Sequence, residues 1–309
     1  MRVATYSAYQ NTINQLQTRQ RSLQTTQEQL TSGKRVSKPS DDPVAAATAE
    51  RALAAMAKAD AQKRALQAAR SSTQLSESAL SDAGELLQQS REALVGMGNA
   101  TYTDSERANL ADKIKGLRDQ LLGVANRTDG SGAYLFGGQG ASSPPFVDGA
   151  TGVTYQGSAG DTLVATESTL STSIDGQQAW LQAPGTNAGD PPLSIFKVLD
   201  TAINSLSAPG VSSQDVAAAV KTGISDLDTF NNHLLAVRAR AGEALNRMDQ
   251  LEQRIADSKL ASQTEKSNAE DLDMVQAISD FQNQQTGYDA ALKAYSLVQR
   301  MSLFNYISG

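Results

Sequence analysis

The sequence offers few side chains that could act in catalysis or bind a metal ion. His233 is the only histidine, and the chain has no cysteine, so no thiolate can bind a metal or attack a substrate. His233 lies beside a stripe of apolar residues, next to Leu234, and no serine or metal-binding constellation accompanies it. We therefore interpret His233 as a packed helix residue and expect no enzyme activity, no metal site and no cofactor.

Two adjacent carboxylates, Asp41 and Asp42, could serve acid–base chemistry or hold a cation. Pro43 follows them, and proline suits the first turn of a helix, where a preceding aspartate accepts hydrogen bonds from free N–H groups. We interpret these three residues as a helix cap. The glycines between residues 130 and 140 predict flexible turns, because they lack the Lys-Ser/Thr ending and the following helix of a phosphate loop.

The residues before this cap predict a hinge. Gly33 ends the preceding helix, because glycine adopts the left-handed stop conformation without strain. Lys34, Arg35 and Lys38 follow as a short basic cluster. The cluster is either a solvated face of the hinge or a contact with acidic residues of a neighbouring molecule.

Composition limits the class of protein. The 309 residues include 27 Lys and Arg against 33 Asp and Glu, and this net charge of -6 argues against nucleic acid as a partner. Hydrophobic residues make up 39% and aromatics 5%, which is typical of slender helical assemblies rather than of one thick core. We find no apolar stretch that predicts a cleaved secretory signal or a membrane span.

Long helices are predicted by apolar residues that alternate in steps of four and three. The first stripe lies in residues 5–32, and two more lie in residues 44–127, which a break at residues 96–99 divides into an antiparallel hairpin. After the break, Thr103 and Glu106 have the spacing of a capping box and predict the start of the second helix. Helix is predicted again at residues 193–206 and from residue 213. The longest stripe covers residues 216–255, and a last one covers residues 274–295, after a polar interruption.

Between these helices, residues 129–192 are rich in Gly, Ser, Thr and Pro. Short strands are predicted at residues 133–136, 152–156, 162–165 and 169–174, with turns at Asp148-Gly149 and Asp175-Gly176. We predict a small β-rich insert.

The two ends of the chain predict an assembly surface. Seven of the fifteen aromatic residues lie in residues 1–10 and 281–309, although solvated tails are usually poor in aromatics. Two helices with Gln in their stripes are barely stable alone, so we expect the ends to order against neighbouring subunits. The alternative is an intramolecular coiled coil capped by the aromatics. The expected assembly residues are Tyr6, Tyr9, Ile13, Leu16, Leu23, Leu30, Met274, Ile278, Phe281, Tyr288, Leu292, Tyr295, Phe304 and Tyr306.

Three segments resemble a known family. The run from Leu30 to Val36, followed by the run from Pro39 to Ala47, is similar to the N-terminal signature of flagellins, and its Asp-Asp-Pro-Val-Ala form resembles the flagellar hook-associated protein 3 family. The run from Ala125 to Gly138 resembles that family's mid-chain motif. The segments from Gln285 to Ala290 and from Ser302 to Ile307 resemble its C-terminal helix and tail.

This resemblance implies a mainly α, elongated, flagellin-like rod of long antiparallel helices, with the terminal helices paired and a small β-rich insert. Three parts are expected. Residues 1–38 with 272–309 would form the inner-tube domain, residues 39–128 with 193–271 the helical bundle, and residues 129–192 the outer domain.

The implied function is a structural subunit of the bacterial flagellum that joins hook to filament by head-to-tail polymerisation. Implied partners are copies of itself in a ring or helical lattice, another hook-associated protein, flagellin and a flagellar export chaperone, with no nucleic acid and no membrane. The expected location is the extracellular flagellum, reached without a cleaved signal peptide. Two alternatives stay open, namely flagellin itself and a soluble helical signalling module.

Overall fold

The computed structural model describes every residue except 1, 99–101, 140, 142, 159, 161–162, 165–169, 172–173, 188, 308 and 309. Among the residues that it describes, side chains are described for all except residues 2–6, 8, 163–164, 170–171 and 298–307. In this part of the chain the structure is mainly helical, with a small β-rich segment, as the sequence predicts. Its contacts divide the chain into two compact units, residues 1–60 with 256–309 and residues 61–255. The three-part division remains a prediction.

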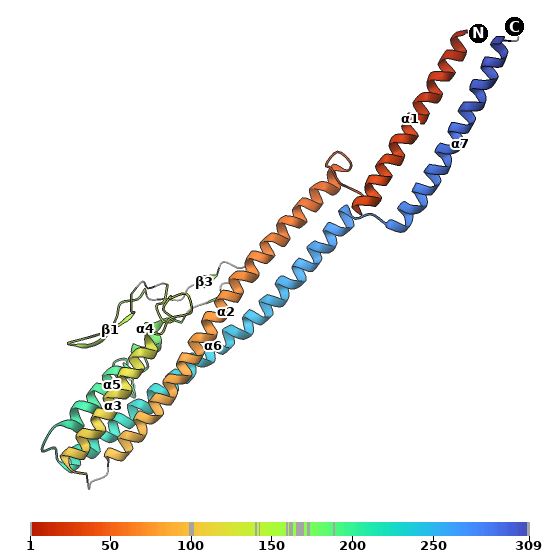
Figure 1. The fold of residues 1–309 in the computed structure, drawn as a ribbon. Coiled ribbons are helices and arrows are strands. Elements are labelled where there is room, and N and C mark those ends of the chain that lie inside the picture. Colours follow the sequence, from red (N-terminus) through yellow and green to blue (C-terminus); the bar gives the residue numbers. More distant parts are fainter. Residues whose placement is uncertain are drawn as a thin grey trace. The chain divides into compact units, whose positions relative to one another are not determined.

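The first unit contains four helical segments. They are α1 (Arg2–Ser32), the beginning of α2 (Pro43–Met97), the end of α6 (Ser213–Glu270) and α7 (Met274–Ile307). Helices α1 and α7 run side by side in opposite directions (Figure 1). The sequence predicted both helices, but the polar interruption of its apolar stripe is helical as far as Glu270, and the break lies at residues 271–273.

The second unit contains the remaining lengths of α2 and α6 and all other elements. These are α3 (Asp104–Ala125), β1 (Phe146–Gly149), β2 (Gly152–Tyr155), β3 (Leu163–Val164), β4 (Leu170–Ser171), α4 (Gly176–Leu181) and α5 (Ile195–Ser207). Strand β1 pairs with β2 and β3 with β4, both antiparallel. Thr103 and Glu106 form the predicted capping box at the start of α3.

The predicted stripes of α2 and α6 form the core of the second unit. In α2 the buried members recur every seven residues; they are Leu66, Thr73, Leu80, Leu87 and Leu94. In α6 the buried members include Val216, Val220, Leu227, Phe230, Leu234, Val237 and Met248. The four-three spacing therefore identified the packed faces correctly, because a long helix buries one stripe against its neighbours.

The β-rich segment differs from its prediction in three places. No strand forms at residues 133–136, because Leu135 and Phe136 are buried in the helical core. The turn signal at Asp175 instead begins helix α4, where its carboxylate accepts hydrogen bonds from the N–H groups of Gln177 and Gln178. Strand β1 was not predicted, and the expected turn at Asp148-Gly149 forms its last two residues. Of the other predicted strands, residues 152–155 form β2, and β3 and β4 lie within the remaining two.

An aromatic cluster and an arginine hold this segment on the helices of the second unit. Trp180 of α4 is fully buried, with its ring centroid 5.3 Å from that of Phe136 and 6.4 Å from that of Phe196. Arg118 of α3 donates hydrogen bonds of 2.6 and 2.9 Å to the carboxylate of Asp148 in β1. Its Nε lies 2.6 Å from Oδ1 of Asp200 in α5. The segment is therefore anchored by packing and by charge.

Candidate assembly surface

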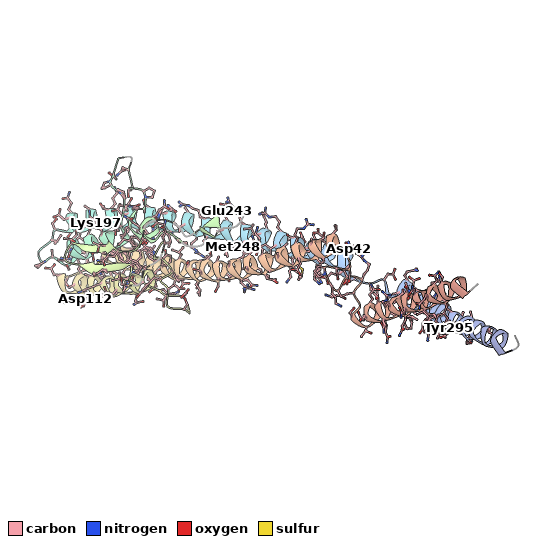
Figure 2. All side chains as sticks on the ribbon, turned by 90° about the horizontal axis from the view of Figure 1, so that it is seen from above. Asp42, Asp112, Lys197, Glu243, Met248 and Tyr295 are labelled. Carbon is pink, nitrogen blue, oxygen red and sulfur yellow. The ribbon has the colours of Figure 1, made fainter. Side chains whose placement is uncertain are left out.

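The predicted assembly residues lie on the paired helices α1 and α7. Tyr9 and Tyr295, the latter labelled on α7 in Figure 2, meet across the pair with ring centroids 5.7 Å apart. Their hydroxyl oxygens are 2.8 Å apart, and this hydrogen bond raises the pKa of Tyr295. Aromatic side chains of the two chain ends therefore pack against each other within one molecule.

Burial within the stripes is incomplete. The half-buried members are Ile13, Leu16, Leu23, Leu30, Phe281, Tyr288 and Tyr295. The exposed members are Tyr9, Met274, Ile278 and Leu292, with 41–47% of their surface accessible. The side chains of Tyr6, Phe304 and Tyr306 lie outside the described residues. One partner helix thus covers part of the α7 stripe and leaves the rest in solvent.

The two units differ sharply in how they bury large side chains. All twelve of the largest fully buried side chains belong to residues 61–255. In the first unit the described buried apolar residues are Val36, Ala49, Ala52, Ala59, Ala269 and Ala277. Where side chains are described, thirteen large hydrophobic residues are exposed, and nine of them lie in this smaller unit. The first unit therefore has little core of its own and much apolar surface without cover.

Polar contacts that the sequence did not reveal fix the pairing of α1 and α7. Thr26 is buried and donates a hydrogen bond of 3.1 Å to Oε1 of Gln284. A Cβ at Gly287 would lie 2.8 Å from Nη1 of Arg19, so a side chain there would displace the guanidinium. Glycine lowers the stability of a helix, and at position 287 it admits Arg19 against the α7 backbone.

The hinge between α1 and α2 is bonded to the hinge between α6 and α7. Gly33 has φ of +69° and ends α1, and its carbonyl accepts a hydrogen bond of 3.0 Å from the N–H of Leu272. The N–H groups of Arg35 and Val36 both donate to the carbonyl of Glu270, at 2.6 and 3.3 Å. The two connections therefore form one short paired segment.

Two residues of the basic cluster, Lys34 and Arg35, contact the C-terminus of α6. Lys34 Nζ lies 2.6 Å from the carboxylate of Glu270, and Arg35 donates a hydrogen bond of 2.8 Å to the carbonyl of Ala269. Cations are favourable at this end of a helix, where unpaired carbonyls carry partial negative charge. The Lys34 ammonium holds the pKa of Glu270 below its ordinary value. Two of the three basic residues thus have partners within the chain.

The two aspartates before Pro43 act on different N–H groups. Asp42 Oδ1 accepts from Val44 and Ala45 in the first turn of α2, at 3.1 and 3.0 Å. Asp41 Oδ2 accepts from the N–H groups of Ser37 and Lys38, which closes the hinge turn. These backbone hydrogen bonds lower the pKa of both carboxyl groups. Figure 2 labels Asp42 at the start of α2.

The structure places His233 in packing contacts. Its Nε2 lies 3.0 Å from the carbonyl oxygen of Gln178, and burial lowers its pKa. Among the described residues, no group of three or more His, Cys, Asp and Glu side chains is arranged to hold a metal ion. No helix in the same part of the chain is both long and apolar enough to cross a membrane.

Known proteins are similar to this chain in fold and in sequence. The pattern of the bacterial flagellin N-terminal helical region matches residues 3–141. Flagellar hook-associated protein 3 of Salmonella typhimurium is 34% identical over 318 residues, which cover 98% of this chain and 99% of that protein. Flagellin of Bacillus subtilis is 24% identical over 284 residues, covering 91% and 90%. The crystal structure of flagellar hook associated protein-3 from Legionella pneumophila superposes with a TM-score of 0.63, at 20% identity, covering 70% of this chain and 97% of that one.

The helical architecture and the matched N-terminal region define a flagellin-like structural protein. The identity over nearly the whole length is more specific, and the chain belongs to the flagellar hook-associated protein 3 family. It is a helical structural component of the bacterial flagellum, in agreement with the resemblance seen in three segments of its sequence. This family is structural, which is consistent with the expectation of no enzyme activity, and nothing in it favours the signalling module.

Proposed function

We propose that this chain forms the junction between hook and filament by head-to-tail polymerisation through its terminal helices. The observation that carries the proposal is the difference in packing between the two units. The twelve largest fully buried side chains among the described residues all belong to the second unit, whereas α7 exposes the stripe residues Met274, Ile278 and Leu292. Copies of the chain would supply the missing cover, because helices of this kind gain most of their stability from tertiary packing.

Within this proposal the predicted division of the chain has a mechanical meaning. Residues 1–38 with 272–309 would form the inner tube, and residues 39–128 with 193–271 would form the bundle around it. The insert, residues 129–192, would face outward. A repeated heterologous contact between such subunits generates a ring or a helical lattice. The observed pairing of α1 with α7 supports the inner-tube assignment.

The partners follow from the position at the junction. Another hook-associated protein would contact one side of the ring and flagellin the other. An export chaperone would hold the C-terminal helix before assembly, and the unfolded chain would pass through the flagellar channel without a cleaved signal. The absence of cysteine suits this route, because no disulfide has to be opened before transit.

Hydrogen exchange on purified monomer, mapped by peptide, tests the proposal. We expect fast exchange in residues 1–32 and 274–309 and slow exchange in residues 44–127 and 216–255, because among the described residues most buried apolar side chains lie on α2, α3 and α6 and few lie on α1 and α7. Assembled material should show slow exchange at both ends. Strong protection of both ends in a confirmed monomer would contradict the proposal and favour the self-contained coiled coil.

A further inference from the structure

Two tyrosines from opposite ends of the chain meet in a geometry that suits oxidative coupling. The rings of Tyr9 in α1 and Tyr295 in α7 have centroids 5.7 Å apart, and their planes are inclined at 38°. The hydroxyl of Tyr295 donates a hydrogen bond of 2.8 Å to the hydroxyl of Tyr9. An oxidised phenol couples through the ring carbons next to the one that carries the hydroxyl. The contact of the two hydroxyls therefore brings the reactive sides of both rings together.

The pair is accessible, and the described part of the chain contains no second pair of this kind. Tyr9 has 41% of its surface accessible and Tyr295 is half-buried, so a small oxidant reaches both phenols from solvent. The other tyrosines with described side chains contact no tyrosine ring; they are Tyr102, Tyr134, Tyr155 and Tyr288. Among these side chains, coupling within one molecule is therefore directed to a single place.

We propose that Tyr9 and Tyr295 form an oxidative crosslinking site, at which a peroxide acting through a haem peroxidase joins the two ends of one chain as dityrosine. Each phenol loses one electron and one proton and becomes a phenoxyl radical. The two radicals form a carbon–carbon bond between ring positions next to the hydroxyls. The hydrogens on those two carbons then move to the phenol oxygens, which restores both aromatic rings. The two protons and two electrons that are removed reduce one hydrogen peroxide to two waters.

The new bond would hold α1 and α7 together as a covalent staple. It closes a loop that runs from Tyr9 to Tyr295, almost the whole chain, so the two ends could no longer separate freely. Noncovalent packing in this unit is sparse, because its described buried apolar residues are one valine and five alanines. The inference rests on the pairing observed within one chain and does not depend on the proposed polymerisation.

Peptide mapping of the oxidised chain tests the site. Dilute wild-type chain is treated with a haem peroxidase and hydrogen peroxide, digested with trypsin and analysed by mass spectrometry. Cleavage after Lys and Arg places Tyr9 in residues 3–19, and Tyr295 becomes the only tyrosine of residues 294–300. Fragment ions distinguish Tyr9 from Tyr6 within the first peptide. We expect these two peptides to be linked in material of monomeric mass, at a yield independent of protein concentration, because both phenols belong to one molecule. A link found only in dimers, links between other peptides alone, or no dityrosine would overturn the proposal.

Phenylalanine variants separate this site from general oxidation. Tyr9→Phe and Tyr295→Phe keep the packed rings but remove one phenol, so each should lower the total intramolecular dityrosine, measured by fluorescence, by about tenfold. Tyr134→Phe removes a half-buried tyrosine of the second unit and should leave that yield within about twofold of the wild type, because its ring contacts no other tyrosine. An equal fall in all three variants would overturn the proposal.

Hydrogen exchange on the purified crosslinked monomer measures the staple itself. Exchange in residues 2–32 and 274–307 should be several-fold slower than in the untreated chain, because the helices can no longer move far apart. The Tyr9→Phe chain after the same oxidation should exchange as fast as the untreated chain. Unchanged exchange in the crosslinked monomer would show that the bond does not hold the helices together and would overturn the staple.

Discussion

The contrast between the two units predicts opposite consequences for the same truncation of leucine. Leu94 of α2 is fully buried in the second unit, where its Cδ1 would contact a Cβ at Gly223 at 3.3 Å. Leu23 of α1 is half-buried in the first unit. Replacing each with alanine removes the same atoms, so the difference in effect reports the surroundings and not the chemistry.

The expected magnitudes follow from burial. Leu94→Ala should lower the free energy of unfolding by about 3 kcal/mol, since a fully buried leucine leaves a cavity that closes only partly. For a unit of this size that corresponds to a fall in Tm of roughly 6 to 12 °C. Leu23→Ala should lower the stability of the free chain by less, about 1–2 kcal/mol, because part of the side chain is already in water and its loss leaves no closed cavity.

The two substitutions should affect assembly in the opposite order, with the larger effect from Leu23→Ala. Leu23→Ala removes a residue that we expect to be covered by a neighbour, so it should raise the concentration needed for polymerisation about tenfold, which corresponds to about 1.4 kcal/mol per contact. Leu94→Ala should leave that concentration unchanged wherever the chain is folded. Calorimetry on monomer and light scattering during assembly measure the two effects. The reasoning is refuted if Leu23→Ala lowers Tm as much as Leu94→Ala and leaves assembly untouched.

Three other changes test local features. Glu270→Gln should lower the free energy of unfolding by about 1 kcal/mol near pH 7. Because the pKa of Glu270 is depressed in the folded state, the wild type holds this stabilisation above the ordinary pKa of 4.5 and loses it as the pH falls below that value. The unfolding free energies of the two chains should therefore converge near pH 3. Arg118→Ala should cost about 3 kcal/mol in thermal unfolding, because it leaves two carboxylates facing each other in a partly buried site, and a cost below about 1 kcal/mol would contradict this. Gly33→Ala should destabilise by about 1–2 kcal/mol through its left-handed conformation alone, since a Cβ there meets no atom within 4 Å, while Gly96→Ala inside α2 should stabilise slightly.

The sequence predicted local features well where local chemistry decides them. The capping box of Thr103 and Glu106, the stop at Gly33 and the buried faces of α2 and α6 all depend on residues within a few turns of one another. The pairing of the hinge between α1 and α2 with the hinge between α6 and α7 was not predicted, because the contact of Lys34 with Glu270 joins segments far apart in the chain. The prediction of a strand at residues 133–136 was wrong for a similar reason: a short run of apolar and aromatic residues resembles a strand until the helical core that buries Leu135 and Phe136 is known.

The α7 stripe shows where periodicity stops being informative. Met274, Phe281 and Tyr288 lie on one four-three stripe, and the sequence gives no reason to separate them. The structure exposes Met274 but half-buries the other two, since the single helix α1 covers only one flank of α7. Periodicity indicates which side of a helix is buried, whereas the number of helices that pack against that side depends on the assembly. The uncovered flank is therefore a physical reason to expect further copies, and hydrogen exchange in assembled material measures whether they cover it.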